Sequence, residues 1–234
     1  MVYNKAVQEN NGKADKQEGA SYVYSDILAN EDGITVNARI TIVNVDKYAS
    51  LYVFDDDTRT PGRFSPTVNT TKDGGYGVTF KIDFFCEDED GEEIPVFLNG
   101  FKVTAVDIDG GESVALTGFL NYITDEQKCA LTITPRTDGF TQFYGEGNLA
   151  DCNFDDTRSF IAEYAVPVSS LQMELKNYKS TGDRPTSSQR MYSINFGVAG
   201  GVFTNPKPTK NPTSPTITLT PDKDTYTHKE NTLT

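Results

Sequence analysis

Apolar and polar residues alternate along much of the chain from about residue 20. In ITVNARITI, the residues Ile34, Val36, Ala38, Ile40 and Ile42 fall on one side of an extended chain, opposite polar neighbours. A period of two is typical of a half-buried β-strand. The same pattern predicts further strands in YGVTFKIDF, FKVTA, ALTIT, SFIAEYAV, LQMEL and RMYSINFGV, with turn clusters such as KDGG and STGDRP between them. At least eight strands with this spacing, and no helical periodicity, predict an all-β protein: a β-sandwich, jelly-roll-like.

The pattern changes near both ends, which predicts four segments. Residues 1–20 are polar and aperiodic and are expected to form a flexible N-terminal arm, and residues 21–203 form the sandwich domain. Residues 204–216 contain four prolines and are expected to form a Pro/Thr-rich linker. Alternation resumes in residues 217–234, which predicts the start of a further β module or a tail that pairs with the main sheet.

Composition excludes several classes of protein. The 234 residues carry a net charge of −13 without a basic stripe, which argues against nucleic-acid binding. No apolar stretch approaches the length of a membrane span. The 14 Phe and 12 Tyr residues supply core volume in a chain of modest aliphatic content. Cys86, Cys129 and Cys152 are too far apart for a structural zinc site, and they leave open one disulfide with a free thiol or three buried thiols.

Catalysis finds little support in the sequence. The one histidine, His228, lies near the C-terminus, and no Ser-His-Asp, Cys-His or phosphate-binding glycine motif is present. No pair of carboxylates stands out as a glycosidase pair. The chain is therefore predicted not to be an enzyme. Tryptophan is absent, so an aromatic platform for a sugar would depend on tyrosines. The candidates are Tyr76, Tyr122, Tyr144 and Tyr192.

The stretch VDIDGGE is the strongest candidate for a metal site. On an extended chain Asp107 and Asp109 point to the same side, at the edge of the buried face. Two neighbouring carboxylates there require a cation, backbone amides or a raised pKa. Gly110 and Gly111 allow carbonyl oxygens to turn inward. Ca²⁺, which accepts six to eight oxygen ligands in loose geometry, fits better than Mg²⁺. A bulge that turns both acids to water is the alternative.

Two similar acidic segments, FDDDTR and FDDTR, extend the set of candidate calcium ligands. They contribute Asp55 and Asp56 from the first copy and Asp155 and Asp156 from the second. Such segments occupy equivalent corners of a sandwich or contribute to one site. The alternative is an acidic turn in which Asp caps backbone amides and pairs with Arg59 or Arg158. A third acidic stretch, EDEDGEE, is expected to be a solvated hairpin turn.

The order of VTAVDIDG, FYGEG and RMYSINFG, followed by a Pro/Thr linker and a new β module, resembles β-sandwich modules of large bacterial cell-surface, adhesin-type proteins. The resemblance covers roughly residues 30–203. It implies a non-catalytic extracellular module that binds a cell-surface glycan or protein, or that spaces neighbouring β modules of the same chain. The first 20 residues contain no apolar segment typical of a secretion signal, so we expect either a chain that is not secreted or a fragment whose targeting signal lies elsewhere. A structural protein of a phage particle or filament is therefore an alternative, and a carbohydrate-binding accessory module is another.

Overall fold

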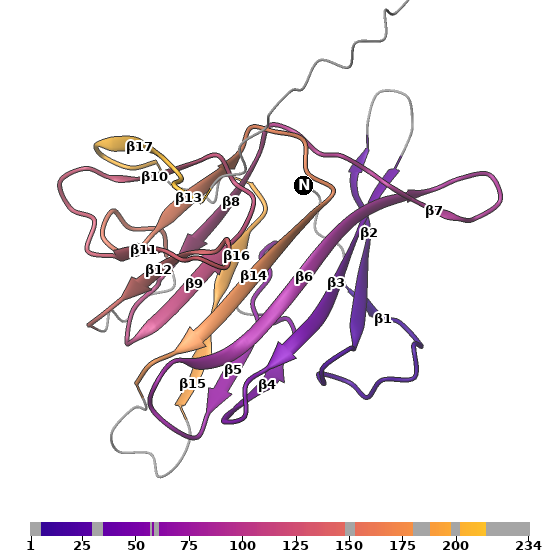
Figure 1. Ribbon diagram of the computed structural model, residues 1–234, viewed down its shortest axis with the longest axis horizontal. Coiled ribbons are helices and arrows are strands. Elements are labelled where there is room, and N and C mark those ends of the chain that lie inside the picture. The colour runs from indigo at the N-terminus through magenta and orange to yellow at the C-terminus, as the bar shows by residue number, and fades with distance from the viewer. Residues whose placement is uncertain are drawn as a thin grey trace, which may run out of the picture.

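The computed structural model describes residues 6–29, 35–56, 58, 61–147, 153–179, 188–197 and 202–213, which form three antiparallel β-sheets. Arg59, Cys152, His228 and the predicted module start at 217–234 lie outside these residues. The largest sheet is one layer of the molecule (Figure 1). Its strands, in spatial order, are β1 (Val7–Gln8), β2 (Ser21–Ala29), β3 (Thr35–Val45), β6 (Tyr76–Glu87), β14 (Ser170–Asn177), β9 (Glu112–Leu116), β12 (Thr141–Gly145) and β11 (Thr132–Pro135), and β7 (Glu93–Pro95) pairs with the end of β6.

The second layer consists of two smaller sheets. The five-stranded sheet has the order β16 (Ser193–Asn195), β8 (Phe101–Val106), β13 (Phe160–Tyr164), β10 (Asn121–Asp125) and β17 (Pro206–Lys210). The three-stranded sheet has the order β15 (Ser188–Met191), β5 (Thr67–Thr70) and β4 (Ala49–Val53). Tyr192 alone separates β15 from β16, so one stretch of chain crosses from one small sheet to the other.

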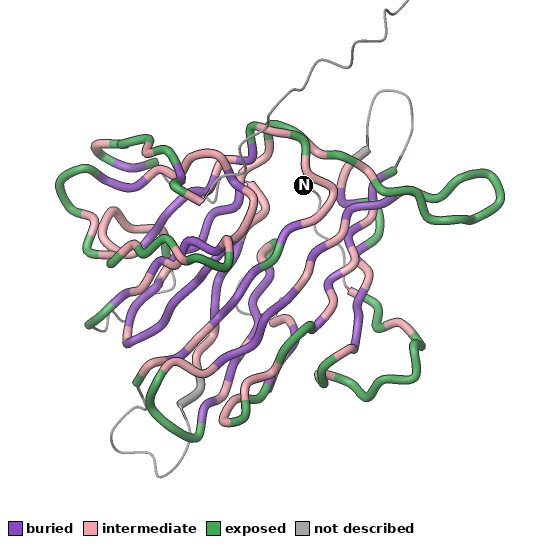
Figure 2. Tube along the Cα trace, viewed as in Figure 1, coloured by how far each residue is buried: buried purple, intermediate pink, exposed green. Residues whose placement is uncertain are grey.

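The core lies between the two layers, as a β-sandwich requires. Val36, Ala38, Ile40 and Ile42 are all buried, which confirms the inner face predicted from alternation. Aromatic rings join the layers: Phe143 of β12 stacks on Phe160 of β13 with centroids 3.6 Å apart. Figure 2 shows the buried positions concentrated along the strands and the hairpin between β6 and β7 exposed. The sequence therefore predicts the all-β sandwich correctly. Among the described residues, none forms a helix with the length and apolarity that crossing a membrane requires.

The predicted N-terminal arm packs against the large sheet where it is described. Val7 and Gln8 pair with β2, and the Glu9 amide donates to the Ser21 carbonyl at 2.9 Å. Arg39 of β3 holds the Glu9 carboxylate, with its Nε 2.8 Å from Oε2. The prediction of a loose arm is therefore wrong for residues 6–20. A two-residue strand with no buried side chain escapes detection because its stability comes from pairing rather than from an apolar face.

The predicted linker at 204–216 is also wrong in part, because Pro206–Lys210 forms the edge strand β17. The hydrogen bond from the Asn211 amide to the Leu120 carbonyl fixes which peptide groups face β10. In an antiparallel pair, the backbone N–H and C=O groups of alternate residues point to the partner strand. Those of residues 207 and 209 therefore point to β10, and those of Pro206 and Pro208 point away from it. Proline lacks an N–H group, so it is tolerated where none is needed. The prolines that suggested a linker are thus compatible with an edge strand.

Ending the chain after Thr204 should therefore destabilise the domain. That truncation removes β17 and Asn211, a fully buried residue whose amide donates to the Phe119 carbonyl at 3.0 Å and whose Oδ1 accepts from Thr141. We expect a loss of at least about 2 kcal/mol, or about 4–8 °C in the unfolding midpoint, because buried polar groups lose their partners. Thermal unfolding followed by circular dichroism measures it. A chain ended after Thr213, which keeps these contacts, is the control. Equal midpoints for the two truncations would show that β17 is dispensable.

Candidate functional site

The loop of Asp107 and Asp109 does not continue the strand that precedes it. β8 ends at Val106, and Asp107 adopts a φ of 59°, in the left-handed region. The alternation that would place both carboxylates on one side ends there. Asp109 is buried, whereas Asp107 is half-buried. The regular strand on which that expectation depended is therefore interrupted at Asp107, although one Asp107 oxygen is buried and the charges of both acids act on Glu112.

The same loop lies across the end of β12. The Gly111 amide donates to the Gly145 carbonyl at 3.0 Å, and the Ile108 amide donates to the Arg158 carbonyl at 3.0 Å. A Cβ atom on Gly145 would lie 1.8 Å from the Ile108 carbonyl oxygen. Glycine is thus required at position 145 for the close approach of two backbones.

A buried ion pair follows the loop. Glu112 opens β9 on the same face as Val114 and Leu116, so its carboxylate enters the space between the layers, where only 5% of the side chain is exposed. Arg190 of β15 lies opposite, with its Nε 3.5 Å from Glu112 Oε1 and its Nη2 3.0 Å from the Gly110 carbonyl oxygen. Burial raises the pKa of Glu112 well above its usual value, opposed by Arg190 and supported by the nearby charges of Asp109 and Asp107. An arginine thus supplies positive charge beside the acids where the sequence predicts a metal ion.

A second set of buried polar side chains lies beside this ion pair, because Asn177 of β14 is directly across from Glu112 of β9. The Tyr192 hydroxyl donates to Asn177 Oδ1 at 2.6 Å, and the side-chain Nδ2 of Asn177 donates to the Val68 carbonyl at 3.1 Å. Burial raises the pKa of Tyr192 well above its usual value, with a smaller contribution from the charge of Glu112. This tyrosine is only 2% exposed, which excludes it from a surface platform for a sugar. Together with the Glu112–Arg190 ion pair, these side chains form a buried polar cluster between the large sheet (β9 and β14) and the three-stranded sheet (β15 and β5).

The first Phe-Asp-Asp segment accepts hydrogen bonds from protein donors. Asp55 accepts from the Tyr24 hydroxyl at 2.5 Å and from the Ser65 amide at 2.8 Å. Asp56 accepts from the Thr58 amide and hydroxyl, at 3.2 and 2.5 Å. The capped backbone amides are one part of the acidic turn that the sequence left as the alternative, whereas its proposed partner Arg59 lies outside the described residues.

The second segment forms the same kind of turn with different partners. Asp155 caps the amides of Thr157 and Arg158 at 2.5 and 2.9 Å. Asp156 accepts from Lys128 Nζ at 2.7 Å and from the Thr204 hydroxyl at 2.5 Å. The Lys128 ammonium and then the Thr204 donors lower the pKa of Asp156 to about 2. The structure thus gives the two segments separate sets of contacts.

Within the described residues, no group of three or more His, Cys, Asp or Glu side chains is arranged to hold a metal ion. Calcium binding by Asp107, Asp109, Asp55, Asp56, Asp155 and Asp156 stays a prediction. The acidic stretch EDEDGEE is an exposed hairpin turn, as predicted, in which Asp88 caps the amides of Asp90 and Glu92 at 3.0 and 2.8 Å. Cys86 and Cys129 are free and half-buried thiols.

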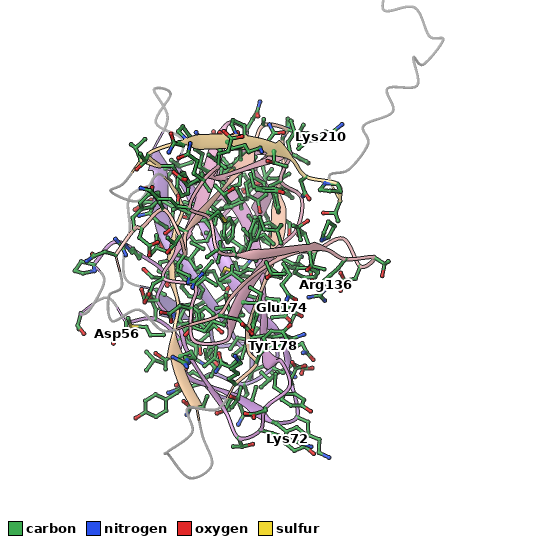
Figure 3. The ribbon with its side chains drawn as sticks, turned by 90° about the vertical axis from the view of Figure 1, so that its left-hand side faces the viewer. Asp56, Lys72, Arg136, Glu174, Tyr178 and Lys210 are labelled. Carbon is green, nitrogen blue, oxygen red and sulfur yellow. The ribbon has the colours of Figure 1, made fainter. Side chains whose placement is uncertain are left out.

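Charged and aromatic side chains gather on the outer face of the large sheet. Arg136 forms an ion pair with the buried carboxylate of Glu174, and Lys176 Nζ lies 2.8 Å from the other oxygen of that carboxylate. The Tyr178 hydroxyl donates to Gln142 Oε1 at 3.1 Å, and the Tyr144 ring meets the Tyr178 ring edge-on at 5.0 Å. Arg136, Glu174 and Tyr178 lie on the same side of the molecule (Figure 3). These side chains bind one another, so this face is held in one arrangement.

An apolar pocket lies between the layers. Its floor is the inner face of β2, β3 and β6, and its cover is the segment of Gly62 and Phe64, which is hydrogen-bonded to Ile194 by the amide of Phe64 at 2.8 Å. The cavity measures about 60 Å³ and has its rim at the exposed Gly62 and the half-buried Phe196. Its lining consists of Tyr24, Ile27, Ala38, Ile40, Gly62, Phe64, Ile82, Phe84, Asn195 and Phe196.

The small side chain of Ala38 contributes to this space. It lies on β3 between the larger Val36 and Ile40 of the same face, directly across from Phe84 of β6. Sequence reasoning missed the pocket because alternation identifies the inner face without identifying the segment that covers it. The one available signal was an alanine in an otherwise bulky inner row.

Comparisons with known proteins give structural likeness only. No family model and no curated protein matches the chain. The adhesin domain of PrgB from Enterococcus faecalis bound to DNA matches at 12% identity with a TM-score of 0.45, covering 77% of this chain and 68% of that chain. The N-terminal domain of the Streptococcus gordonii adhesin Sgo0707 matches at 10% identity with a TM-score of 0.43, and the match covers 81% of this chain and 49% of that chain. Glucan binding protein C of Streptococcus mutans matches at 13% identity with a TM-score of 0.42, and the match covers 84% of this chain and 64% of that chain.

These are bacterial adhesin domains and adherence proteins. The resemblance drawn from the sequence agrees with them, but identities and TM-scores of this size do not place the chain in a family. The chain spans about half the length of the Sgo0707 domain that it matches.

Proposed function

We propose that the chain is a non-catalytic, adhesin-type binding module at the cell surface that takes an apolar group of its ligand into the pocket between its layers. The observation that carries this proposal is the pocket itself, a concave site rimmed by residues that reach the surface. Partners commonly fill such small apolar recesses with a single anchoring side chain.

The size of the pocket favours a protein ligand over a glycan. A single water needs a cavity volume of about 10–15 Å³. A cavity of about 60 Å³ therefore has room for a few waters or one aliphatic side chain. The lining offers two polar side chains, Asn195 and Tyr24, and the Tyr24 hydroxyl already donates to Asp55. A sugar hydroxyl buried there would lose its hydrogen bonds with water and gain few in return.

The pocket also lacks the groups that catalysis would need. Its described lining contains no carboxylate, thiol, imidazole or amine. The buried Glu112 belongs to the polar cluster with Arg190. The chemistry of the pocket is therefore that of binding.

Filling the pocket tests this proposal. Ala38→Leu replaces a methyl group with an isobutyl group in the cavity, and it should weaken ligand binding at least tenfold while the domain stays folded, since the larger group occupies the space of the anchor. An array of extended peptides and an array of glycans, each probed with the parent and the variant, measure the effect. Ala49→Leu on β4, outside the lining, is the matched control.

The outcomes separate the alternatives. Capture of peptides with aliphatic side chains, lost in Ala38→Leu and kept in Ala49→Leu, supports the proposal. Glycan binding that Ala38→Leu leaves unchanged would instead favour the carbohydrate-binding alternative through another surface. Capture of neither probe contradicts a binding role for the pocket.

A further inference from the structure

Each layer ends in an edge strand on the same side of the molecule. Among the described residues, β11 ends the large sheet and β17 ends the five-stranded sheet. Figure 1 shows both at the left of the view. An edge strand presents unpaired N–H and C=O groups to other chains, and proteins usually protect such edges.

The β17 edge is protected. Its outward positions include Pro206 and Pro208, which have no N–H group to offer. Lys207 and Lys210 are exposed on the same strand and add positive charge. Proline and lysine are the residues that commonly block pairing at an edge.

The β11 edge lacks these devices along most of its length. The Arg136 amide donates to the Phe140 carbonyl at 2.8 Å, which sets the alternation of the β11–β12 pair. Thr132 and Thr134 then exchange hydrogen bonds with β12, and the N–H and C=O of Ile133 face outward. Pro135 at the end of the strand still offers its carbonyl oxygen.

The composition of β11 suits pairing with a second copy. The stretch ALTITP carries no charge in a chain of net charge −13, so two copies repel least where these strands meet. Thr132, Ile133 and Thr134 are β-branched, and the two threonines are exposed. In an antiparallel arrangement centred on Ile133, each Thr132 faces Thr134 of the other copy, a favourable cross-strand pair.

We propose that β11 is a self-association edge, at which two copies of this chain pair antiparallel about a two-fold axis at Ile133 and join their large sheets. The two Ile133 residues exchange two main-chain hydrogen bonds. In the same register the Pro135 carbonyl of each copy accepts from the Leu131 amide of the other, which gives two more. Such a contact is isologous, so it closes at two copies.

A concentration series of the full chain in sedimentation velocity tests the proposal. The parent should shift from monomer to dimer as concentration rises. Ile133→Pro removes one outward N–H per copy without removing a hydrogen bond to β12. It should raise the dissociation constant about twenty-five-fold, because two of four hydrogen bonds are lost and each contributes about a factor of five.

A second variant keeps the test decisive if the proline disturbs folding. Thr134→Lys places like charges at the centre of the contact and should also weaken the dimer, whereas Thr71→Lys, the same change at an exposed turn away from β11, should leave it unchanged. Hydrogen exchange at the Ile133 amide should slow as the parent dimerises. A parent that stays monomeric at every concentration, or a dimer that neither β11 variant weakens, would overturn the proposal.

Discussion

Gly145→Ala should lower the free energy of unfolding by about 3 kcal/mol or more. The new Cβ would lie 1.8 Å from the Ile108 carbonyl oxygen, and both partners in this clash are backbone atoms that cannot rotate away. Ile108 is itself only 1% exposed, so the loop that carries it has little room to move. Relief of the clash would stretch the hydrogen bond between Gly111 and Gly145. Urea denaturation monitored by circular dichroism measures the loss.

Gly139→Ala provides the control. Gly139 has a φ of 88° and no atom within 4 Å of an added Cβ, so it combines backbone strain with open space. That strain costs about 1–2 kcal/mol. Losses of similar size in the two variants would mean that strand β12 and the loop at 107–112 separate easily, contrary to the packing described.

Arg190→Ala should cost about 3–5 kcal/mol at a pH above the folded pKa of Glu112, since it leaves the buried, ionised carboxylate without its ion-pair partner. The double variant Arg190→Ala, Glu112→Gln should recover part of that loss because no charge then remains buried. Thermal and urea unfolding of the parent, both single variants and the double variant complete a mutant cycle. Purely additive losses would show that the two side chains do not interact.

The cost of Arg190→Ala should also depend on pH. The pKa of Glu112 is raised in the folded state, so between its unfolded value of about 4.5 and its folded value the native protein holds more protons than the unfolded one. Stability contributed by this group therefore falls as pH rises through that window. Below the unfolded pKa Glu112 is neutral in both states, and the loss caused by Arg190→Ala should shrink. A loss that is constant across the window would contradict a buried, ionising Glu112.

Alternation along the sequence predicted the strands that have one buried face. Residues such as Val36 and Ile40 reveal such strands because their environment follows a strict period. Strand β17 was missed because prolines usually interrupt sheets, and their tolerance here depends on which peptide groups face β10. Which peptide groups face β10 is set by how the two strands pair, and the local sequence pattern carries no information about that pairing.

The candidate site was less predictable for a related reason. The paired acids suggested a cation, but the positive φ of Asp107 and the arrival of Arg190 from a distant strand decide their surroundings. The capping role of Asp155 was foreseen as an alternative because Asp commonly accepts backbone amides in turns. The apolar pocket depends on the segment of Phe64 lying across β3 and β6, a contact between distant parts of the chain.

The stretch that carries β15 and β16 determines when the second layer can be completed. It pairs with β5, more than a hundred residues earlier, and with β8, and it brings Arg190, Tyr192 and Ile194 to the interior. During synthesis, the two small sheets therefore remain unconnected until residues 188–195 have emerged, more than a hundred residues after β5. Pairings of such long sequence separation slow folding, because the entropy of closing the loop is lost before the contacts form. Until then part of the apolar inner face of the large sheet stays exposed, and exposed apolar surface on a nascent chain promotes aggregation.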